Sequence, residues 1–165
     1  TDLGRRLAAV APCYAVAGNH ELRFGRTGEY ARLLERAGVR VLRDGWTLLE
    51  REGETLTLYG MERKRPRPLP ASCPRPVIAL AHQPQWLYLY EAAGWDLVIS
   101  GHAHGGQVRL IGQGLYAPGQ GMLPPFTSGL YRRGNTQMAV SRGLGNSTFS
   151  LRFGNRLHLP VLVLG

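Results

Sequence analysis

Residues 96–106 read DLVISGHAHGG, a short apolar run that leads directly into a loop carrying two histidines. An apolar run of this length, bounded by glycine, is typical of a buried strand, so we predict a strand over 96–100. His102 and His104 stand two residues apart, and in an extended or looped segment such residues can point to one side and share a site. The flanking glycines would let backbone approach a ligand closely, or they could serve a tight turn.

Two other predicted strands end in the same way. An apolar run at 14–17 leads into Gly-Asn-His-Glu at 18–21, and a second run at 77–81 ends at His82. In open α/β sheets, ligands bind beyond the carboxyl ends of the strands. Four of the five histidines therefore fall where one sheet edge could gather them: His20, His82, His102 and His104. The alternative for any single histidine is a surface or capping residue, which we assign to His158.

The remaining pattern predicts an α/β fold with some antiparallel pairing. Apolar residues at helical spacing predict helices over 2–11, 27–37 and 85–93, with Thr27 as an N-cap. Further strands are predicted over 39–42, 46–51, 55–61, 137–141 and 158–164, with hairpin turns at Asp44-Gly45 and Glu52-Gly53. Residues 112–135, rich in glycine and proline, predict a long loop, and the Arg/Pro-rich residues 62–76 predict an exposed extended loop.

The composition excludes several classes of protein. The chain has 165 residues, of which 44% are hydrophobic and 19% charged, so it fits one domain and is too apolar to be disordered. No run approaches 18 apolar residues, which argues against a transmembrane helix, and residues 1–12 lack the apolar core of a signal peptide. Cys13 and Cys73 lie far apart, which argues against a disulfide framework or a cysteine-based zinc site.

The charge balance is strongly basic, with a net charge of +9 and an isoelectric point near 10.4. Lys64 is the single lysine among 20 basic residues, which we attribute first to a GC-rich genome. The arginines are scattered apart from residues 63–75, and aromatic residues are not interleaved with them. This pattern argues against a nucleic-acid partner.

Three motifs together resemble a known family. Residues 18–21 (GNHE), 81–84 (AHQP) and 101–104 (GHAH) resemble, in order and spacing, the last three signature blocks of the calcineurin-like metallophosphoesterases. Residues 101–108, 114–121 and 141–147 further resemble a bacterial subgroup of exported or membrane-associated phosphoesterases, some of which act on lipid-linked pyrophosphates or phosphodiesters. The resemblance runs over nearly the whole chain. It implies a sandwich of two mixed sheets flanked by helices.

The resemblance also implies a metal site. Asn19, His82 and His102 match ligands of one metal ion, His104 matches a ligand of its partner ion, and His20 matches the histidine that contacts the phosphate and protonates the leaving oxygen. Imidazole and amide donors suit two divalent ions drawn from Mn, Fe, Zn, Co or Ni. Two such ions would clamp a phosphoryl group and lower the pKa of a bridging water.

Arg142 is a further candidate for the substrate side of this site. Its guanidinium could hold a phosphate oxygen in a bidentate fashion. The alternative, a solvated surface arginine, remains open.

The family's first two blocks, Asp-x-His and Gly-Asp-x-x-Asp, do not occur in the sequence. We therefore expect residues 1–165 to form a single metallophosphoesterase domain that is N-terminally truncated and represents about the C-terminal two thirds of the usual one. The remaining ligands are neutral, so we expect weak or single metal binding and an inactive chain. Exposed apolar edges would favour self-association or a partner segment that fills the gap.

Three functions follow from these observations. The first is a metal-dependent phosphoesterase that acts on a phosphomonoester, phosphodiester or pyrophosphate. The second is a catalytically silent binding scaffold of the same fold, because a fold alone does not establish activity. The third is a basic protein that binds an anionic surface, for which a phospholipid membrane suits the charge and the subgroup better than nucleic acid does.

Overall fold

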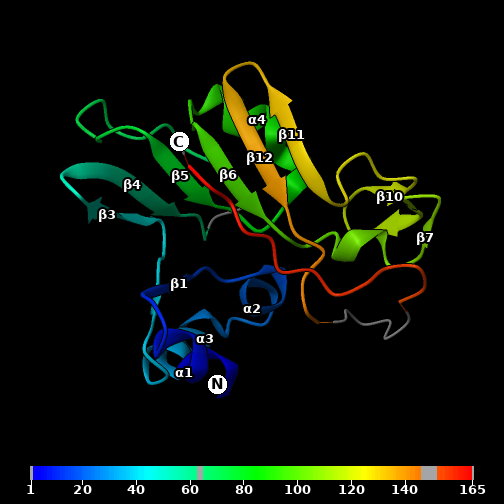
Figure 1. Ribbon diagram of the computed structural model, residues 1–165, viewed down its shortest axis with the longest axis horizontal. Coiled ribbons are helices and arrows are strands. Elements are labelled where there is room, and N and C mark those ends of the chain that lie inside the picture. The colour runs from blue at the N-terminus through cyan, green and yellow to red at the C-terminus, as the bar shows by residue number, and fades with distance from the viewer. Residues whose placement is uncertain (1, 63–64, 146–151, 165) are drawn as a thin grey trace.

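The computed structural model describes residues 2–62, 65–145 and 152–164. Its largest element is a six-stranded mixed sheet with the strand order β11-β12-β6-β5-β4-β3 (Figure 1). The four inner strands run parallel to one another, and each edge strand pairs antiparallel with its neighbour. The strands are β3 Gly45–Arg51, β4 Glu54–Gly60, β5 Val77–Leu80, β6 Leu97–Ser100, β11 Gly129–Arg133 and β12 Thr136–Val140.

The first face of this sheet packs against a short helical segment. That segment comprises the 3-10 turn η1 Pro84–Trp86 and the helix α4 Leu87–Ala92, which lies behind the sheet in Figure 1. Between helix and sheet, the rings of Tyr90 and Trp95 stack with centroids 5.2 Å apart, and both side chains are almost completely buried. β5 and β6 are apolar almost throughout because inner parallel strands are covered on both faces.

A smaller N-terminal layer lies against the second face. The parallel strands β1 Cys13–Ala15 and β2 Val39–Val41 form its sheet, and the helices α1 Asp2–Ala8, α2 Asn19–Arg23 and α3 Thr27–Glu35 accompany it (Figure 1). Buried Leu42, Leu58 and Ile78 join the two layers, with Tyr14 and Val16 packed against them. The α/β fold class is therefore confirmed, with a second sheet of two parallel strands.

A third region follows the six-stranded sheet at the end of β6. It begins with the 3-10 turn η2 His104–Gly106 and continues through two small antiparallel pairs. These pairs join β7 Arg109–Leu110 to β8 Gln113–Gly114, and β9 Tyr116–Ala117 to β10 Gly121–Met122. Only part of the stretch 112–135 is therefore loop. Residues 129–133 form β11, which pairs with β12, although the high glycine content of the stretch favours a loop.

Three other local predictions were wrong. Asp44-Gly45 is no hairpin turn, because β2 and β3 belong to different sheets and the chain crosses between them here. Thr27 is the first residue of α3, whereas Arg26 occupies the N-cap. Residues 158–164 form no strand, since this segment shows only an isolated bridge from His158 to Gly143.

The Arg/Pro-rich segment agrees with its prediction only in part. Arg63 and Lys64 lie outside the described residues, and the rest of 62–76 contains no helix or strand. Cys73 is buried, however, and Arg75 forms an ion pair with Asp96 at 2.8 Å. The end of this loop is therefore tied to the sheet rather than free in solvent.

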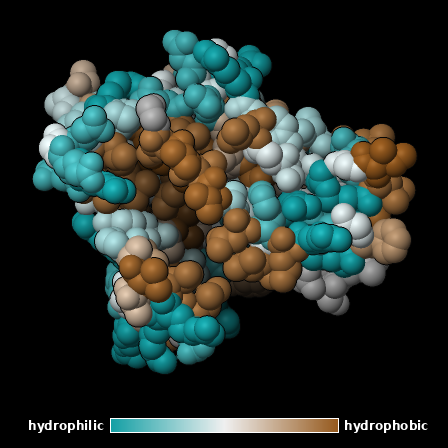
Figure 2. Space-filling model, viewed as in Figure 1, coloured by the Kyte–Doolittle hydropathy of each residue, from teal (hydrophilic) through white to brown (hydrophobic). Residues whose placement is uncertain are grey.

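Figure 2 shows apolar side chains gathered between the six-stranded sheet and the N-terminal layer. The C-terminal segment adds several exposed apolar residues, namely Leu157, Leu159, Val161 and Val163. Exposed apolar surface is typical of interaction sites, and the expected self-association stays a prediction. No helix in the described part of the chain combines the length and apolar character needed to cross a membrane.

Candidate functional site

Three side chains from three elements meet at the carboxyl ends of β5 and β6. His82 follows β5 and His102 follows β6, and because these strands are parallel neighbours their ends lie side by side. His102 Nδ1 lies 3.0 Å from His82 Nε2, and the two rings meet edge to face with centroids 4.8 Å apart. Asn19 Oδ1, at the start of α2, lies 2.9 Å from the same His82 Nε2.

The position of Asn19 depends on its immediate neighbours. The Gly18 N–H donates a hydrogen bond of 2.9 Å to Glu21 Oε2, which anchors the first turn of α2. A Cβ atom on residue 18 would lie only 3.1 Å from His82 Cε1. The glycine therefore allows the backbone before Asn19 to come close to the imidazole.

The loop after β6 is held in an unusual backbone conformation. His102 and His104 have φ values of +62° and +47°, in the left-handed region that residues other than glycine rarely adopt. Buried Asn155 holds the turn from outside, since its Nδ2 donates to the carbonyl oxygens of His104 at 2.7 Å and Gln107 at 3.0 Å. Backbone strain of this kind clusters at functional sites. Here it sets the direction in which the side chains of His102 and His104 leave the loop.

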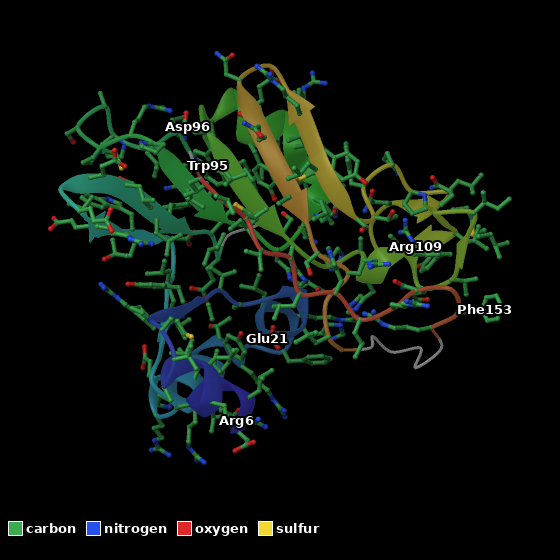
Figure 3. All side chains as sticks on the ribbon, in the orientation of Figure 1. Arg6, Glu21, Trp95, Asp96, Arg109 and Phe153 are labelled. Atoms are coloured by element: carbon green, nitrogen blue, oxygen red, sulfur yellow. The ribbon has the colours of Figure 1, made fainter. Side chains whose placement is uncertain are left out.

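Arg109 ties this loop to the segment that leads into β11 (Figure 3). Its Nη1 donates to the Gly105 carbonyl at 2.7 Å and to Thr127 Oγ1 at 3.0 Å. The guanidinium therefore acts as a brace for the histidine loop.

Burial and neighbouring charges favour the neutral form of His82 and His102. Burial is the largest cause that lowers the pKa of His82 to about 4, followed by the charges of His102, His104 and His20. Burial also lowers the pKa of His102 to about 4, again assisted by His104 and His20, while a hydrogen bond to the Pro118 backbone acts in the opposite direction. Neutral imidazole nitrogens are the form that binds metal ions.

His104 and His20 lie near this group but outside it. Burial, and then the charge of Arg152, lower the pKa of His104, and a hydrogen bond to the Gly145 backbone opposes them. The His20 side chain is exposed on α2, with its ring 6.5 Å from that of Phe24. In the described part of the chain, neither imidazole is hydrogen-bonded to Asn19, His82 or His102.

Arg142 follows β12 and lies on the His104 side. Its Cγ is 2.8 Å from the point that a Cβ on Gly105 would occupy. Its Nε is buried and has no hydrogen-bond partner among the described residues. His158, expected to be a surface or capping residue, accepts a 3.3 Å hydrogen bond from the Arg142 N–H at Nδ1.

Comparison with known proteins identifies the family. The model of the calcineurin-like phosphoesterases matches residues 2–106, well over half of the chain. The chain belongs to the calcineurin-like phosphoesterase family. Phosphodiesterase YaeI of Escherichia coli is 31% identical to it, and the alignment covers 99% of this chain and 62% of that protein.

Other relatives carry the family name. The uncharacterized metallophosphoesterase YkuE of Bacillus subtilis is 29% identical over 97% of this chain and 58% of its own length. A metallophosphoesterase of Campylobacter jejuni, Cj0846, is 43% identical over 46% of this chain. The chain thus spans about three fifths of the length of the first two relatives. No solved structure matches it.

Membership of this metallophosphoesterase family implies divalent metal ions, and three side chains fit one such ion. Ligands bound about 2.1 Å from one ion and at right angles to each other lie about 3 Å apart. The Asn19–His82 and His82–His102 distances, 2.9 and 3.0 Å, match this spacing. Within residues 2–62, 65–145 and 152–164, however, no three side chains of His, Cys, Asp or Glu are grouped to hold a metal.

Sequence reasoning missed the residues that support the site. Gln83 follows His82 directly, and Trp86 donates to the Gln83 side chain across the turn that begins at Pro84. A polar and an aromatic residue on either side of a proline were a usable signal for this turn. Asn155 lies about fifty residues beyond the loop that it holds, so no local pattern could have found it. Gly119 lies within the motif at 114–121, but its closeness to His102 appears only in three dimensions.

Proposed function

We propose that this protein hydrolyses phosphate esters with the help of a divalent metal ion held by Asn19, His82 and His102. The observation that carries the proposal is the meeting of three donor atoms, with neighbours no more than 3.0 Å apart, from three separate elements. Family membership supports it independently, as does the E. coli relative, whose name states phosphodiesterase activity. A phosphodiester is accordingly the first substrate class to test.

The roles of the chain's own residues follow from their positions. Asn19 contributes an amide oxygen, and His82 and His102 contribute neutral imidazole nitrogens because burial keeps them unprotonated. When bound, a divalent ion supplies Lewis-acid polarisation of the phosphoryl group. Gly18 and Glu21 hold Asn19 in place, and Asn155 holds the turn that presents the histidines.

His20, His104 and Arg142 complete the proposal. The exposed ring of His20 is next to Asn19 in the chain, so it can contact a phosphate and give a proton to the leaving oxygen. His104 would serve a second ion of the same kind, drawn from Mn, Fe, Zn, Co or Ni. Arg142, whose buried Nε has no hydrogen-bond partner among the described residues, would hold a phosphate oxygen.

We further propose that the 165-residue chain alone binds one ion weakly and turns over no substrate. The three donors are neutral, and no carboxylate joins them in the described part of the chain to offset the charge of a dication. An anionic surface such as a phospholipid membrane is the partner that the net charge of +9 favours. Nucleic acid remains the weaker alternative.

Isothermal titration with Mn²⁺ or Zn²⁺ tests the site. We expect one weak site in the parent chain and a loss of affinity of about tenfold or more in His82→Ala. His158→Ala is the matched control because the His158 imidazole bonds to the Arg142 N–H and, among the described residues, not to Asn19, His82 or His102, so the affinity of this variant should stay within about twofold of the parent. Equal affinities in the two variants would overturn the site, and two tight sites would overturn the weak single binding.

Hydrolysis of bis(p-nitrophenyl) phosphate with Mn²⁺ tests the activity. The assay compares this chain with the longest open reading frame that contains it. We expect turnover by the longer protein and none by the chain. If neither hydrolyses the ester while metal binding persists, the silent scaffold is the correct interpretation.

A further inference from the structure

A cavity of about 570 Å³ adjoins the candidate metal site. Asn19 and His82 form part of its lining, so it opens directly onto two of the proposed ligands. Its volume falls within the range of small-molecule sites, which are concave and mostly apolar with a few polar groups. Three apolar side chains from three separate segments dominate the rest of the lining: Leu22, Met61 and Trp86.

Hydrogen bonds fix the apolar wall in advance of any ligand. The indole Nε1–H of Trp86 donates to Gln83 Oε1 at 2.8 Å, and the Tyr90 hydroxyl donates to the Gln83 carbonyl at 2.6 Å. Met61 is 4% exposed, and its N–H donates to the Leu80 carbonyl at 2.9 Å. A wall held in this way loses little conformational entropy when an apolar group binds to it.

The charges on the lining favour an anionic ligand. Glu62 is compensated because Arg43 donates to both of its carboxylate oxygens, at 2.8 and 3.2 Å. Arg23 also lines the cavity, and no carboxylate in the described part of the chain pairs with it. The uncompensated charge on the lining is therefore positive.

We propose that this cavity binds the organic group of the phosphate ester and selects esters whose organic group is apolar, such as an aryl group. The phosphate would lie towards Asn19, His82 and Arg23, and the organic group would lie against Leu22, Met61 and Trp86. This inference rests on the proposed phosphoesterase function and adds the substrate class to it. Trp86 and Leu22 are then specificity-determining residues.

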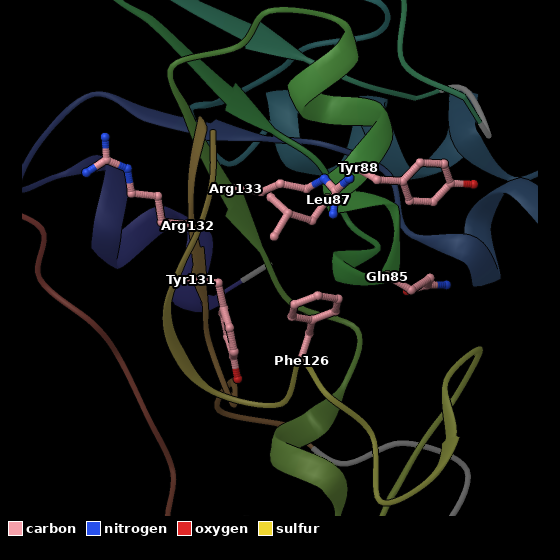
Figure 4. Close-up of a pocket in the computed structure, with 7 residues that line it drawn as sticks. All are labelled: Gln85, Leu87, Tyr88, Phe126, Tyr131, Arg132 and Arg133. Atoms are coloured by element: carbon pink, nitrogen blue, oxygen red, sulfur yellow. The ribbon is translucent and has the colours of Figure 1, made fainter. Parts of the chain in front are cut away.

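A second cavity, of about 370 Å³, provides a control (Figure 4). Phe126 and Tyr131 line it, and their rings meet edge to face with centroids 5.0 Å apart. The charge of Arg133 is already paired with Glu91 at 2.6 Å. None of the proposed metal ligands lines this cavity, so Tyr88, which does line it, is a suitable control position close to Trp86.

The test is binding of 1-naphthyl phosphate to the metal-free chain, followed by the polarisation of naphthyl fluorescence and by the Trp86 Nε1–H resonance. We expect the naphthyl ester, but not inorganic phosphate, to shift this resonance. Leu22→Asp places a charge on the wall at a position that is already 36% exposed, so it should fold, and we expect about tenfold weaker binding or more. Trp86→Ala should weaken binding similarly, whereas Tyr88→Ala and Leu7→Asp, the latter on α1, should leave it within about twofold.

The outcomes separate the two proposals. Equal binding by parent and Leu22→Asp, or an equal shift with inorganic phosphate, would overturn the cavity assignment even if the longer protein hydrolyses esters. Suppose instead that binding depends on Leu22, but the protein expressed from the longest open reading frame hydrolyses no ester. That result would support the cavity assignment and overturn the phosphoesterase function.

Discussion

The six-stranded sheet and the N-terminal layer each contribute part of the candidate site, and the two layers differ in size and in how deeply they are buried. His82 and His102 follow the inner strands β5 and β6, each of which has a hydrogen-bonded strand on both sides. Asn19 and His20 come from the N-terminal layer, in which both strands have three residues and α1 buries none of its side chains. The histidine half therefore rests on a large core and the amide half on short-range contacts.

The difference shows how one site can combine a rigid and an adaptable part. Buried inner strands fix the relative position of two side chains that follow them, because any shift must move several ladder hydrogen bonds together. A side chain at a helix start is fixed mainly by its own capping contacts. If the molecule is organised in this way, damage to the core should cost much more stability than damage to the N-terminal layer.

Trp95→Ala should have the largest effect. Trp95 is 1% exposed and lies between the rings of Tyr59 and Tyr90, at 5.3 and 5.2 Å, so its removal leaves a cavity beneath β5 and β6. We expect the free energy of unfolding, measured in urea, to fall by about 3–5 kcal/mol. Trp46→Ala, at a 46% exposed tryptophan on β3, should cost less than about 1 kcal/mol, and similar losses in both variants would contradict the comparison.

The same difference explains which features the sequence could predict. The inner strands were confirmed within a residue or two, because a run such as 77–81 has to be buried wherever it folds. That reasoning also predicted that the following histidines would share an edge, and His82 and His102 do lie 3.0 Å apart. Features that depend on one dominant local cause can therefore be predicted from the sequence alone.

The errors arose where the outcome depends on a distant partner. Asp44-Gly45 has the composition of a hairpin turn, yet whether the chain turns back or crosses to another sheet is decided by what lies beside it. Residues 158–164 form an apolar run typical of a strand, but no neighbouring strand pairs with them in the described residues. The placement of Asn155 under the histidine loop is likewise a long-range contact.

Gly105→Ala should have the next largest effect. The Gly105 φ value is +67°, and an added Cβ would overlap Asn155 Oδ1 and come within 2.8 Å of Arg142 Cγ. Backbone strain and overlap together should lower the free energy of unfolding by about 2–4 kcal/mol. Gly143→Ala is the matched control, because Gly143 has a φ of +73° but open space around it, so strain alone should cost about 1 kcal/mol. Equal losses of unfolding free energy in the two variants would show that Asn155 does not pack tightly against Gly105 in the histidine loop.

Glu21→Ala should have the smallest effect on stability and the most specific effect on the site. It removes the acceptor of the Gly18 N–H, which is worth about 1 kcal/mol in a helix cap. Because this contact positions Asn19, the side-chain amide resonances of Asn19 should shift while the imidazole resonances of His102, held by β6, stay in place. Glu29→Ala is the control, since Glu29 occupies the first turn of α3, a helix whose N-cap has no side-chain hydrogen bond.

Glu21→Gln separates the two contributions of this carboxylate. Glutamine keeps an acceptor for the Gly18 N–H, so stability and the Asn19 resonances should stay close to those of the parent. Burial, and then the charge of Glu21, raise the pKa of Tyr30 above its ordinary value, so loss of the charge should lower that pKa in an ultraviolet titration. If Glu21→Gln moved Asn19 as far as Glu21→Ala does, charge rather than the cap would position the amide half of the site. The division into a rigid and a locally held half would then have to be replaced by long-range electrostatics.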